Sequence, residues 1–362
     1  MKKIKVLHFE LDDNIGGIEM FIYNLYSHID REKFQFDIVT RRDNPAKKHE
    51  LEELGANIIK VSSYKKIFKY IKDVNEILEN GYDVVHIHKN SASIILPFIL
   101  SSKHNVKNII SHSHNTAPNG GVILKFLHYL NRNKMYKLSN VHLACGKEAG
   151  CWMYGKKDFI QINNAIDLER FKFNEVLRKE IRDKYNLNGK HVIGHIGRFV
   201  YQKNHSFLID VFEKVAEKDK NAILLLVGEG KLLEETKEKV RKLGLKDKVL
   251  FVGSQKDIYK FYQGMDAFVL PSRYEGLVIV MIEAQASGLS CVISKEVPIE
   301  TKILDNVVCM DLNENVDVWA EAVINSVKNG RYVNATKEVE KAGYSLEKEI
   351  EKVVKIYEQY QI

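Results

Sequence analysis

Cysteine and proline are scarce in this sequence of 362 residues, which holds four cysteines and five prolines. The cysteines form no Cys-x-x-Cys pair, and they are too few for the disulfide framework of a small secreted domain. A cysteine-built zinc module is therefore not expected, and we interpret the four as reduced thiols of a cytosolic protein. They are Cys145, Cys151, Cys291 and Cys309.

Long apolar runs are absent as well. The longest candidate, residues 94–100, is much shorter than a membrane-spanning helix and contains Pro97. The sequence starts with basic residues, as a signal peptide does, but His8 and Glu10 interrupt the apolar run that follows. We therefore interpret this start as a first strand and expect a cytoplasmic protein.

The excess of positive charge is modest, with a net charge of +7. No nucleic-acid-binding motif or long basic run accompanies it, so nucleic acid is not an expected partner. We interpret the basic clusters as solvated helix faces. The alternative is attraction to an anionic inner membrane surface, because residues 124–130 interleave aromatic and apolar side chains with basic ones. The clusters are Lys65, Lys66, Lys69 and Lys72, and Lys125, Arg132, Lys134 and Lys137.

Short apolar runs alternate with amphipathic segments such as residues 19–29 and 64–78. This alternation predicts an α/β chain with two doubly wound, Rossmann-like domains. The strands predicted in the first half are residues 4–9, 34–39, 57–61, 84–87, 108–111, 141–144 and 159–162. Those predicted in the second half are residues 191–196, 222–227, 249–252, 267–270, 290–293 and 307–310.

The two halves are joined by a stretch without a strand pattern, residues 163–190. We expect a first domain over residues 1–165, a second over residues 166–345, and a long amphipathic helix over residues 346–362. In open parallel sheets, ligands bind outside the carboxyl ends of the strands. Two such domains therefore predict one cleft between them, and polar residues that follow strands are the candidates for binding.

Two stretches of the first domain place polar residues after a predicted strand. The first carries Gly16 and Gly17 at the start of a helix, which suits a phosphate or substrate loop, although it matches neither Gly-x-Gly-x-x-Gly nor a P-loop. An ordinary tight turn is an equal alternative. The second carries His112 and His114, for which a substrate contact and a structural role are equal alternatives. For the alternating histidines at 86 and 88 we favour a structural role.

In the second domain, Arg198 and Lys203 leave one turn that follows a predicted strand at Gly197. A guanidinium and an ammonium together are suited to hold a diphosphate, although two ordinary surface cations are the alternative. Two further strands end at residues 228–230 and 253–258, where glycines would let a nucleotide approach the backbone.

Glu275 and Gly276 follow the strand at residues 267–270 and open an apolar segment, which predicts a buried helix. The amides of Gly276, Leu277 and Val278 would then lack intrahelical partners and form a seat for an anion. Glu283 would lie about 12 Å along this helix from Glu275 and roughly 80° around it. The alternatives are a buried strand over residues 277–282 and a structural, paired role for Glu283.

Taken in order, these motifs resemble the retaining family-4 glycosyltransferases of the GT-B fold. The hallmark is a Glu followed by seven residues and a second Glu, here Glu275 and Glu283. The Gly-Arg-Phe…Gln-Lys-Asn turn, the Gly-Glu-Gly strand end and the Gly-Gly-Ile-Glu and His-Ser-His-Asn stretches match too. The resemblance spans nearly the whole chain and is greatest to the bacterial exopolysaccharide and capsule transferases. It implies that the C-terminal helix packs back on the first domain.

The resemblance implies roles for individual residues. Arg198 and Lys203 would bind the donor diphosphate and assist its departure, Glu275 would hold the donor sugar, and Glu283 would bond the ribose. His112 or His114 would contact the transferred sugar. The residues implied to line the donor site are Gly16, Gly17, Gly197, Glu229, Gly253, Asp257, Gly276, Leu277, Val278 and Glu283.

The implied reaction is retaining transfer of a hexose or N-acetylhexosamine from a nucleoside-diphosphate sugar, UDP above GDP, to a glycan or polyprenyl-linked acceptor. The family requires no metal or other cofactor, and this sequence has no Asp-x-Asp triplet to carry an ion. It departs from the family at Val278 and Ser290, where proline is usual. A nonhydrolysing nucleotide-sugar epimerase and a two-lobed sugar-binding protein are the alternative functions.

Overall fold

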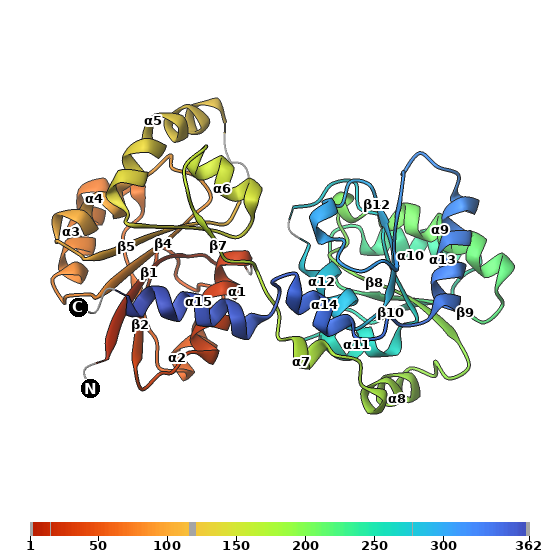
Figure 1. Ribbon diagram of the computed structural model, residues 1–362. Helices are drawn as coiled ribbons and strands as arrows, with labels where there is room; N and C mark the ends of the chain where they lie inside the picture. Colours follow the sequence, from red (N-terminus) through yellow and green to blue (C-terminus); the bar gives the residue numbers. More distant parts are fainter. Residues whose placement is uncertain (1–2, 15, 116–120, 277, 360–362) are drawn as a thin grey trace. The chain divides into compact units, whose positions relative to one another are not determined.

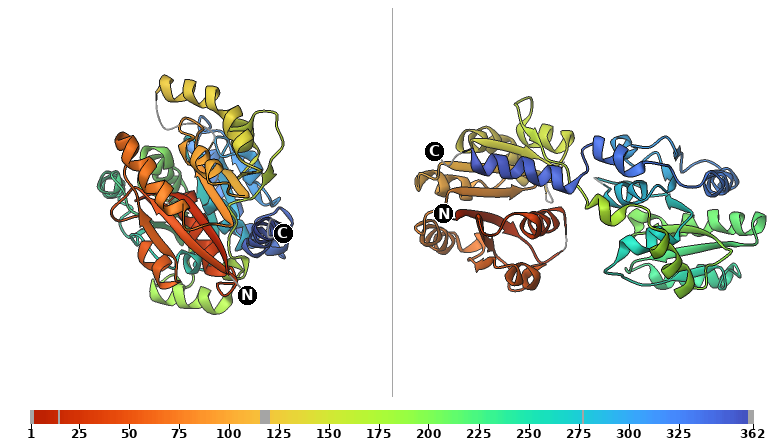
Figure 2. Two further views of the ribbon diagram at one scale, coloured as in Figure 1. Left: turned by 90° about the vertical axis from the view of Figure 1, so that its left-hand side faces the viewer. Right: turned by 60° about the horizontal axis from the view of Figure 1, so that its bottom comes forward.

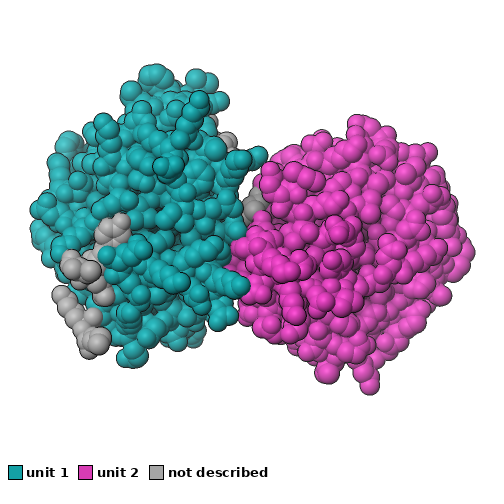
Figure 3. Space-filling model, in the orientation of Figure 1, with its two compact units in different colours: residues 1–164, 346–362 teal, residues 165–345 magenta. Residues whose placement is uncertain are grey.

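The computed structural model describes residues 3–14, 16–115, 121–276 and 278–359. The chain divides into two compact units, coloured separately in Figure 3. We call residues 1–164 with 346–362 unit 1, and residues 165–345 unit 2.

Unit 1 is built on a seven-stranded parallel sheet with the order β3-β2-β1-β4-β5-β6-β7 (Figure 1). The central strands β4 and β5 are buried along their whole length, as expected for strands with helices on both faces. The strands are β1 Ile4–Leu11, β2 Phe34–Thr40, β3 Asn57–Lys60, β4 Val84–Lys89, β5 Asn108–Ser113, β6 Val141–Ala144 and β7 Ile160–Gln161. The helices are α1 Gly17–His28, α2 Lys48–Glu53, η1 Tyr64–Lys66, α3 Ile67–Leu78, α4 Leu96–Lys103, α5 Val122–Leu138, α6 Lys147–Tyr154 and α15 Leu346–Glu358.

Unit 2 repeats this plan with six parallel strands in the order β10-β9-β8-β11-β12-β13. Neighbouring residues of its buried strands face opposite sides of the sheet, so Phe268 and Leu270 join one apolar core and Val269 joins another. The strands are β8 His191–Ile196, β9 Ala222–Val227, β10 Val249–Phe251, β11 Ala267–Leu270, β12 Ser290–Ser294 and β13 Val307–Met310. The helices are α7 Leu168–Phe171, α8 Glu175–Lys184, η2 Tyr201–Lys203, α9 His205–Lys218, α10 Leu233–Lys242, α11 Ile258–Gly264, α12 Ile279–Ala286, η3 Ile299–Thr301, α13 Val316–Asn329 and α14 Ala335–Lys341.

Helix α15 belongs to unit 1 although it follows unit 2 in the sequence. It lies against one face of the unit 1 sheet (Figures 1 and 2). Its Tyr357 hydroxyl bonds Nδ1 of His86 at 2.7 Å, and the Ile356 carbonyl accepts from the Asn108 side chain at 3.4 Å. The predicted return of the C-terminal helix to the first domain is therefore confirmed.

The α/β class and every predicted strand are confirmed, with strand ends within two residues of the prediction. The helix predicted to open at Glu275 is shorter than expected, because α12 begins only at Ile279. The strand alternative for residues 277–282 is wrong. Among the residues that the structure describes, no helix is both long and apolar enough to cross a membrane.

Candidate functional site

Three loops meet at the carboxyl edge of the unit 2 sheet, after β8, β9 and β10. The Phe199 N–H donates to the Glu229 carbonyl at 2.9 Å, and the Gly228 N–H donates to the Gly253 carbonyl at 2.9 Å. Gly228 has a φ of +139°, and a Cβ there would lie 2.1 Å from the carbonyl oxygen of Gly197. Glycine alone fits so close an approach. The three loops therefore form one continuous backbone surface.

Arg198 is an exposed cation of this surface. Within the part of the chain that the structure describes, its guanidinium has no hydrogen-bond or ion-pair partner. The backbone on either side is fixed, because the Gly197 N–H donates to the Val227 carbonyl at 3.0 Å and Phe199 is held as described. A planar guanidinium on a fixed backbone is suited to bind a phosphate with two parallel hydrogen bonds.

Lys203 and Glu275 form a shielded ion pair in unit 2. Lys203 Nζ lies 2.6 Å from Glu275 Oε1, and their side chains are 15% and 6% exposed. Glu275 also accepts from the Ser272 hydroxyl at 2.5 Å and from the Gln202 amide at 2.9 Å. The structure thus brings two predicted site residues together, whereas Arg198, the other predicted cation, has no counter-charge among the described residues.

Glu283 lies inside α12 with 6% of its surface exposed. Its Oε2 accepts from the hydroxyl of Tyr262, on α11, at 2.7 Å. Burial raises the pKa of Glu283 to about 7, although the bond from Tyr262 opposes the rise. The buried carboxylate therefore has the partner that its apolar surroundings require, and it changes charge near neutral pH.

The anion seat predicted on the amides of residues 276–278 assumed a helix that starts there. This start is wrong, because α12 begins only at Ile279. Val278 is the residue before the helix and is buried, whereas Gly276 is exposed and precedes it in a loop. Glu275 is held by its bonds to Ser272 and Lys203, and Gly276 is a poor helix former, so the first turn forms later. Leu277 lies outside the described residues. The 12 Å spacing predicted for one helix does not apply.

The remaining predicted residues of unit 2 lie beside the three loops. Glu229 Oε1 accepts from the Ser254 N–H at 3.4 Å, and Gly253 has a φ of +69°. Asp257 is exposed and pairs with Arg170 at 3.3 Å. The Asp257 side chain is therefore already engaged in an ion pair. The backbone near Gly253 is held where a ligand could approach it closely.

Unit 1 has a pocket of about 550 Å³ at the carboxyl edge of its own sheet. Gly16, Gly17 and His114 are among the residues that line it. His112 is fully buried and does not line it. The two predicted histidines are therefore neighbours with different exposure, and of the two only His114 lines the pocket.

The glycine loop of this pocket is fixed by a buried carboxylate. Glu19, on the first turn of α1, accepts from the Asp12 N–H through Oε1 and from the Gly16 N–H through Oε2, each at 3.0 Å. A carboxylate on the first turn of a helix that bonds the preceding backbone is the usual way to fix such an entry. Both interpretations of the loop, a phosphate or substrate loop and a tight turn, stay open.

A charged network that the sequence interpretation missed also lines the pocket. Glu10 lies 2.5 Å from Lys89 Nζ, 2.8 Å from Arg41 Nη2 and 2.5 Å from the Tyr64 hydroxyl. Burial alone would raise the pKa of Glu10, but Lys89 and Arg41 outweigh it and hold the pKa at about 2. Glu10 has a φ of +81°, which is strained for a residue with a side chain. The signal in the sequence was a carboxylate and a lysine at two strand ends.

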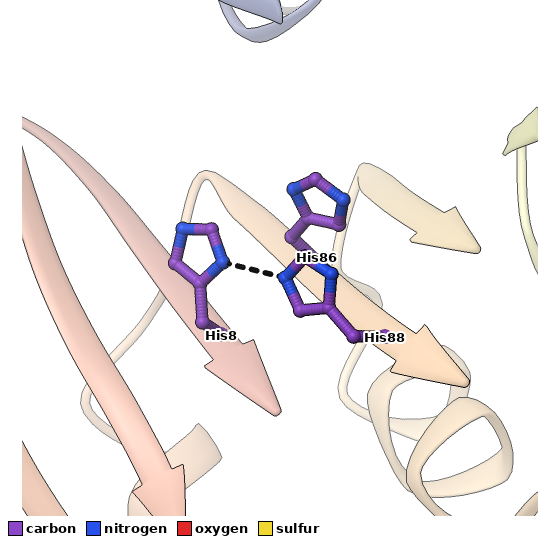
Figure 4. A group of neighbouring side chains, drawn as sticks. All are labelled: His8, His86 and His88. Atoms are coloured by element: carbon purple, nitrogen blue, oxygen red, sulfur yellow. Dashed lines mark hydrogen bonds between the residues drawn. The ribbon is translucent and has the colours of Figure 1, made fainter. Parts of the chain in front are cut away.

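Behind the pocket, five histidines, four of them buried and His114 partly buried, form a second cluster on the sheet face that α1 and α15 cover. One bond joins Nδ1 of His8 to Nε2 of His88 at 3.0 Å (Figure 4), and another joins Nδ1 of His88 to Nε2 of His114 at 2.9 Å. Burial lowers the pKa of each ring, to about 3 for His8 and His114, so the rings are neutral at pH 7. The histidine cluster consists of His8, His86, His88, His112 and His114.

Two family models match the chain. The model described as Glycosyltransferase Family 4 matches residues 15–170, and the model described as Glycosyl transferases group 1 matches residues 178–345.

Curated relatives extend over most of the sequence. A putative glycosyltransferase, EpsF of Bacillus subtilis, is 32% identical over 98% of this chain and 96% of its own length. The UDP-Gal:alpha-D-GlcNAc-diphosphoundecaprenol alpha-1,3-galactosyltransferase of Escherichia coli is 22% identical over 81% of this chain and 79% of its own.

Solved structures share the fold at low identity. Anabaena Alr3699/HepE in complex with UDP aligns with a TM-score of 0.74 at 18% identity, covering 98% of both chains. A glycosyltransferase from Rickettsia africae aligns with a TM-score of 0.81 at 18% identity, covering 99% of both chains. These likenesses confirm the expected GT-B fold.

Proposed function

We propose a sugar transfer for this chain, which belongs to the glycosyltransferases of family 4 and group 1. In this proposal it moves a hexose or N-acetylhexosamine from a nucleoside-diphosphate sugar to a glycan or lipid-linked acceptor. The observation that carries the proposal is Arg198, an exposed cation on the surface made by the loops after β8, β9 and β10, with no counter-charge in the part of the chain that the structure describes. Uridine is the proposed base, because the structural neighbour HepE binds UDP and UDP-glucose.

In the proposed complex, Arg198 and Lys203 bind the donor diphosphate. Glu275 holds the Lys203 ammonium at 2.6 Å and keeps it in place as the phosphates arrive. Glu283 accepts hydrogen bonds from the ribose hydroxyls, and the backbone of the three loops takes the remaining contacts. The two cations then meet the charge that grows on the leaving diphosphate, which a metal ion would otherwise meet. The proposed transfer therefore requires no metal and no other cofactor.

We assign the acceptor to the pocket of unit 1, where the lining combines charged and hydroxyl-bearing side chains. The proposed attack comes from the face that the leaving group departs from. The bond from the sugar's anomeric carbon to the phosphate oxygen breaks, the bond to the acceptor oxygen forms, and the acceptor's proton moves to the departing phosphate oxygen. The anomeric configuration is retained. Of the described carboxylates that line the pocket, Glu10 and Asp12 are engaged in ion pairs, and Glu19 accepts from two backbone N–H groups, so we place none of them as a free nucleophile.

Retention and independence from metal can be tested in one assay. Purified protein with excess chelator is given UDP-hexoses and an undecaprenyl-diphosphate sugar, and the anomeric signal of the first product is followed by proton NMR. We expect transfer with the donor's own configuration. An inverted product would contradict retention, and activity restored only by Mg²⁺ would contradict independence from metal. An epimerised nucleotide sugar without acceptor would replace the transferase proposal with the epimerase alternative.

Helix α5 carries a surface that suits an anionic membrane. Its apolar side chains point outward, with exposed fractions of 85% at Val122, 75% at Ile123, 66% at Phe126 and 63% at Leu130. These exposed apolar side chains favour the membrane alternative over an ordinary solvated face, because solvated faces are polar. Basic and apolar residues on one exposed helix are typical of helices that lie in a lipid interface. We propose that α5 binds anionic lipid and brings the protein to lipid-linked acceptors.

Vesicle binding tests the surface on α5. We expect the protein to sediment with vesicles that contain phosphatidylglycerol and to remain in solution with phosphatidylcholine alone. The double variant Ile123→Ser, Phe126→Ser removes apolar area worth about 1.5–3 kcal/mol per side chain, so binding should fall at least tenfold. Val176→Ser is the matched control, because Val176 is 77% exposed on α8 of unit 2. Equal losses in both variants, or none in either, would contradict the assignment to α5.

A further inference from the structure

Three rings of the histidine cluster converge beside the pocket of unit 1. His88 and His112 lie directly opposite each other on β4 and β5, and His114 follows two residues later. Each of the three offers a ring nitrogen such that the nitrogens all lie within 4.8 Å of one another. His88 and His114 also line the pocket, which gives this group access from outside.

Two nitrogens of this group are buried without a hydrogen-bond partner among the described residues. They are Nε2 of His112 and Nδ1 of His114. Nearly all buried polar atoms in proteins have a partner, and one that lacks it weakens the fold by about 1–3 kcal/mol. The ring of Phe21 packs edge-on against His112 with a centroid distance of 4.7 Å, which is a weak substitute for a partner. Nε2 of His112 is the orphan that a ligand in the pocket would complete.

The outer histidines are placed as a metal's supporting shell would be. A metal-bound imidazole usually donates its other N–H to a neighbour, which orients the ring. Nδ1 of His112 bonds Nε2 of His86 at 3.2 Å, and Nδ1 of His86 bonds the Tyr357 hydroxyl at 2.7 Å. Nε2 of His88 bonds Nδ1 of His8 at 3.0 Å (Figure 4).

One set of protonation states satisfies all these bonds at once. His112 donates to His86, His86 donates to the oxygen of Tyr357, and His88 donates to His8. Nε2 of His112 and Nδ1 of His88 are then lone pairs. With the proton of His114 on Nδ1, its Nε2 is the third lone pair, and the metal then takes the place of the hydrogen bond between His88 and His114.

We propose that His88, His112 and His114 bind one divalent late transition-metal ion, Zn²⁺ above all, with water from the pocket as a fourth ligand. Imidazole nitrogens suit zinc, and three histidines with an open fourth position are an established zinc geometry. The His88 and His114 nitrogens, now 2.9 Å apart, would separate to roughly 3.3 Å around a tetrahedral ion.

The charge of the pocket agrees with a cation. Its described lining includes three carboxylates, those of Glu10, Asp12 and Glu19, against two cations, Arg41 and Lys89. The ion would lie beside the pocket that we assign to the acceptor, whereas the charge of the leaving diphosphate is met by Arg198 and Lys203 in unit 2. Metal binding is measured without donor or acceptor, so its test is independent of the test of sugar transfer.

The test is metal binding by the full chain after chelator treatment. Titration with Co²⁺, whose visible d–d bands report a low-symmetry nitrogen-rich site, should saturate at one equivalent, and Zn²⁺ should displace it. His114→Gln and His112→Asn should each lower the affinity at least 100-fold, and His8→Asn, in the supporting shell, by roughly 10- to 100-fold. His49→Gln is the control, because the His49 side chain is 82% exposed on α2, and it should change nothing.

Circular dichroism checks that each variant is folded. His114 is at the pocket edge, so His114→Gln carries the test if the fully buried His112 does not tolerate change. Absence of cobalt bands would overturn the proposal, and so would unchanged affinity in His114→Gln. A loss of binding in His49→Gln would assign the metal to the surface and overturn the site as well.

Discussion

Arg198→Ala is expected to lower the rate of sugar transfer about 10²- to 10³-fold, the usual loss when one donor to a developing negative charge is removed. The change should leave the melting temperature unaltered, because the side chain is exposed and has no partner in the described part of the chain. Initial rates with a UDP-sugar and a lipid-linked acceptor, together with a thermal melt, measure both quantities. A stable but inactive variant would place Arg198 on the leaving group.

Two further variants make this result specific. Arg241→Ala removes a surface arginine that pairs with Glu238 on α10, and it should leave the rate unchanged. Lys203→Ala should lower both rate and stability, since it leaves the Glu275 carboxylate, 6% exposed, without its ammonium. If Arg198→Ala retained more than half of the wild-type rate, the diphosphate site on the loops after β8 and β9 would be wrong.

Donor affinity should rise with pH until Glu283 has lost its proton, near pH 7. Ribose hydroxyls donate to a carboxylate, and burial raises the pKa of Glu283 to about 7. Below that pH the carboxyl group holds a proton that binding must displace, so affinity should fall up to tenfold per pH unit. Glu283→Gln should weaken UDP binding by about 10- to 100-fold and remove this pH dependence, since hydrogen bonds to a charged group contribute about 1.5–3 kcal/mol.

Calorimetric titration of UDP between pH 5.5 and 8.5, a range about 1.5 units either side of that pKa, measures the effect. Tyr262→Phe removes a hydrogen bond that lowers the pKa of Glu283, so the inflection should move to higher pH. Glu235→Gln, on exposed α10, is the control and should keep the wild-type profile. A flat profile in the wild-type protein would contradict a ribose contact through Glu283.

The proton of Glu283 also affects the free energy of unfolding, which should fall with rising pH, whereas donor affinity should rise. The folded state keeps the proton of Glu283 up to about pH 7, whereas the unfolded chain releases it near 4.5. Between these values the folded state binds more protons, so stability decreases as pH rises, by about 3 kcal/mol in total. A buried carboxylate that weakens the fold at neutral pH is expected where binding, rather than folding, needs the charge.

The strands and their parallel order were predictable because each is a short apolar run between clear helix patterns. The start of α12 was not, although its apolar residues were recognised. Hydrophobic periodicity locates a helix but not its first turn, and here the bonds of Glu275 to Lys203 and Ser272 hold the chain in a loop beyond the expected start. Lys203 and Glu275 are 72 positions apart, so no local sequence pattern predicts that they pair.

The site was predictable as a set of residue types but not as a set of contacts. His86 and His88 alternate on one strand, which the sequence shows, yet their meeting with His8 and His112 depends on the register of β4 against β1 and β5. The ion pairs of Glu10 depend on its φ of +81° near the end of β1, and no local sequence pattern predicts this conformation for a glutamate.

The membership of α15 in unit 1 has a consequence for biosynthesis. Residues 165–345 are contiguous and can fold as soon as they leave the ribosome, whereas the first 164 residues must wait for the segment that completes them. Until residues 346–358 emerge, His86 lacks its tyrosine partner and the apolar face that Ile350, Val353 and Tyr357 cover is open to water. The domain translated first is thus the domain finished last, and a nascent chain stalled within unit 2 would expose it to chaperones and proteases.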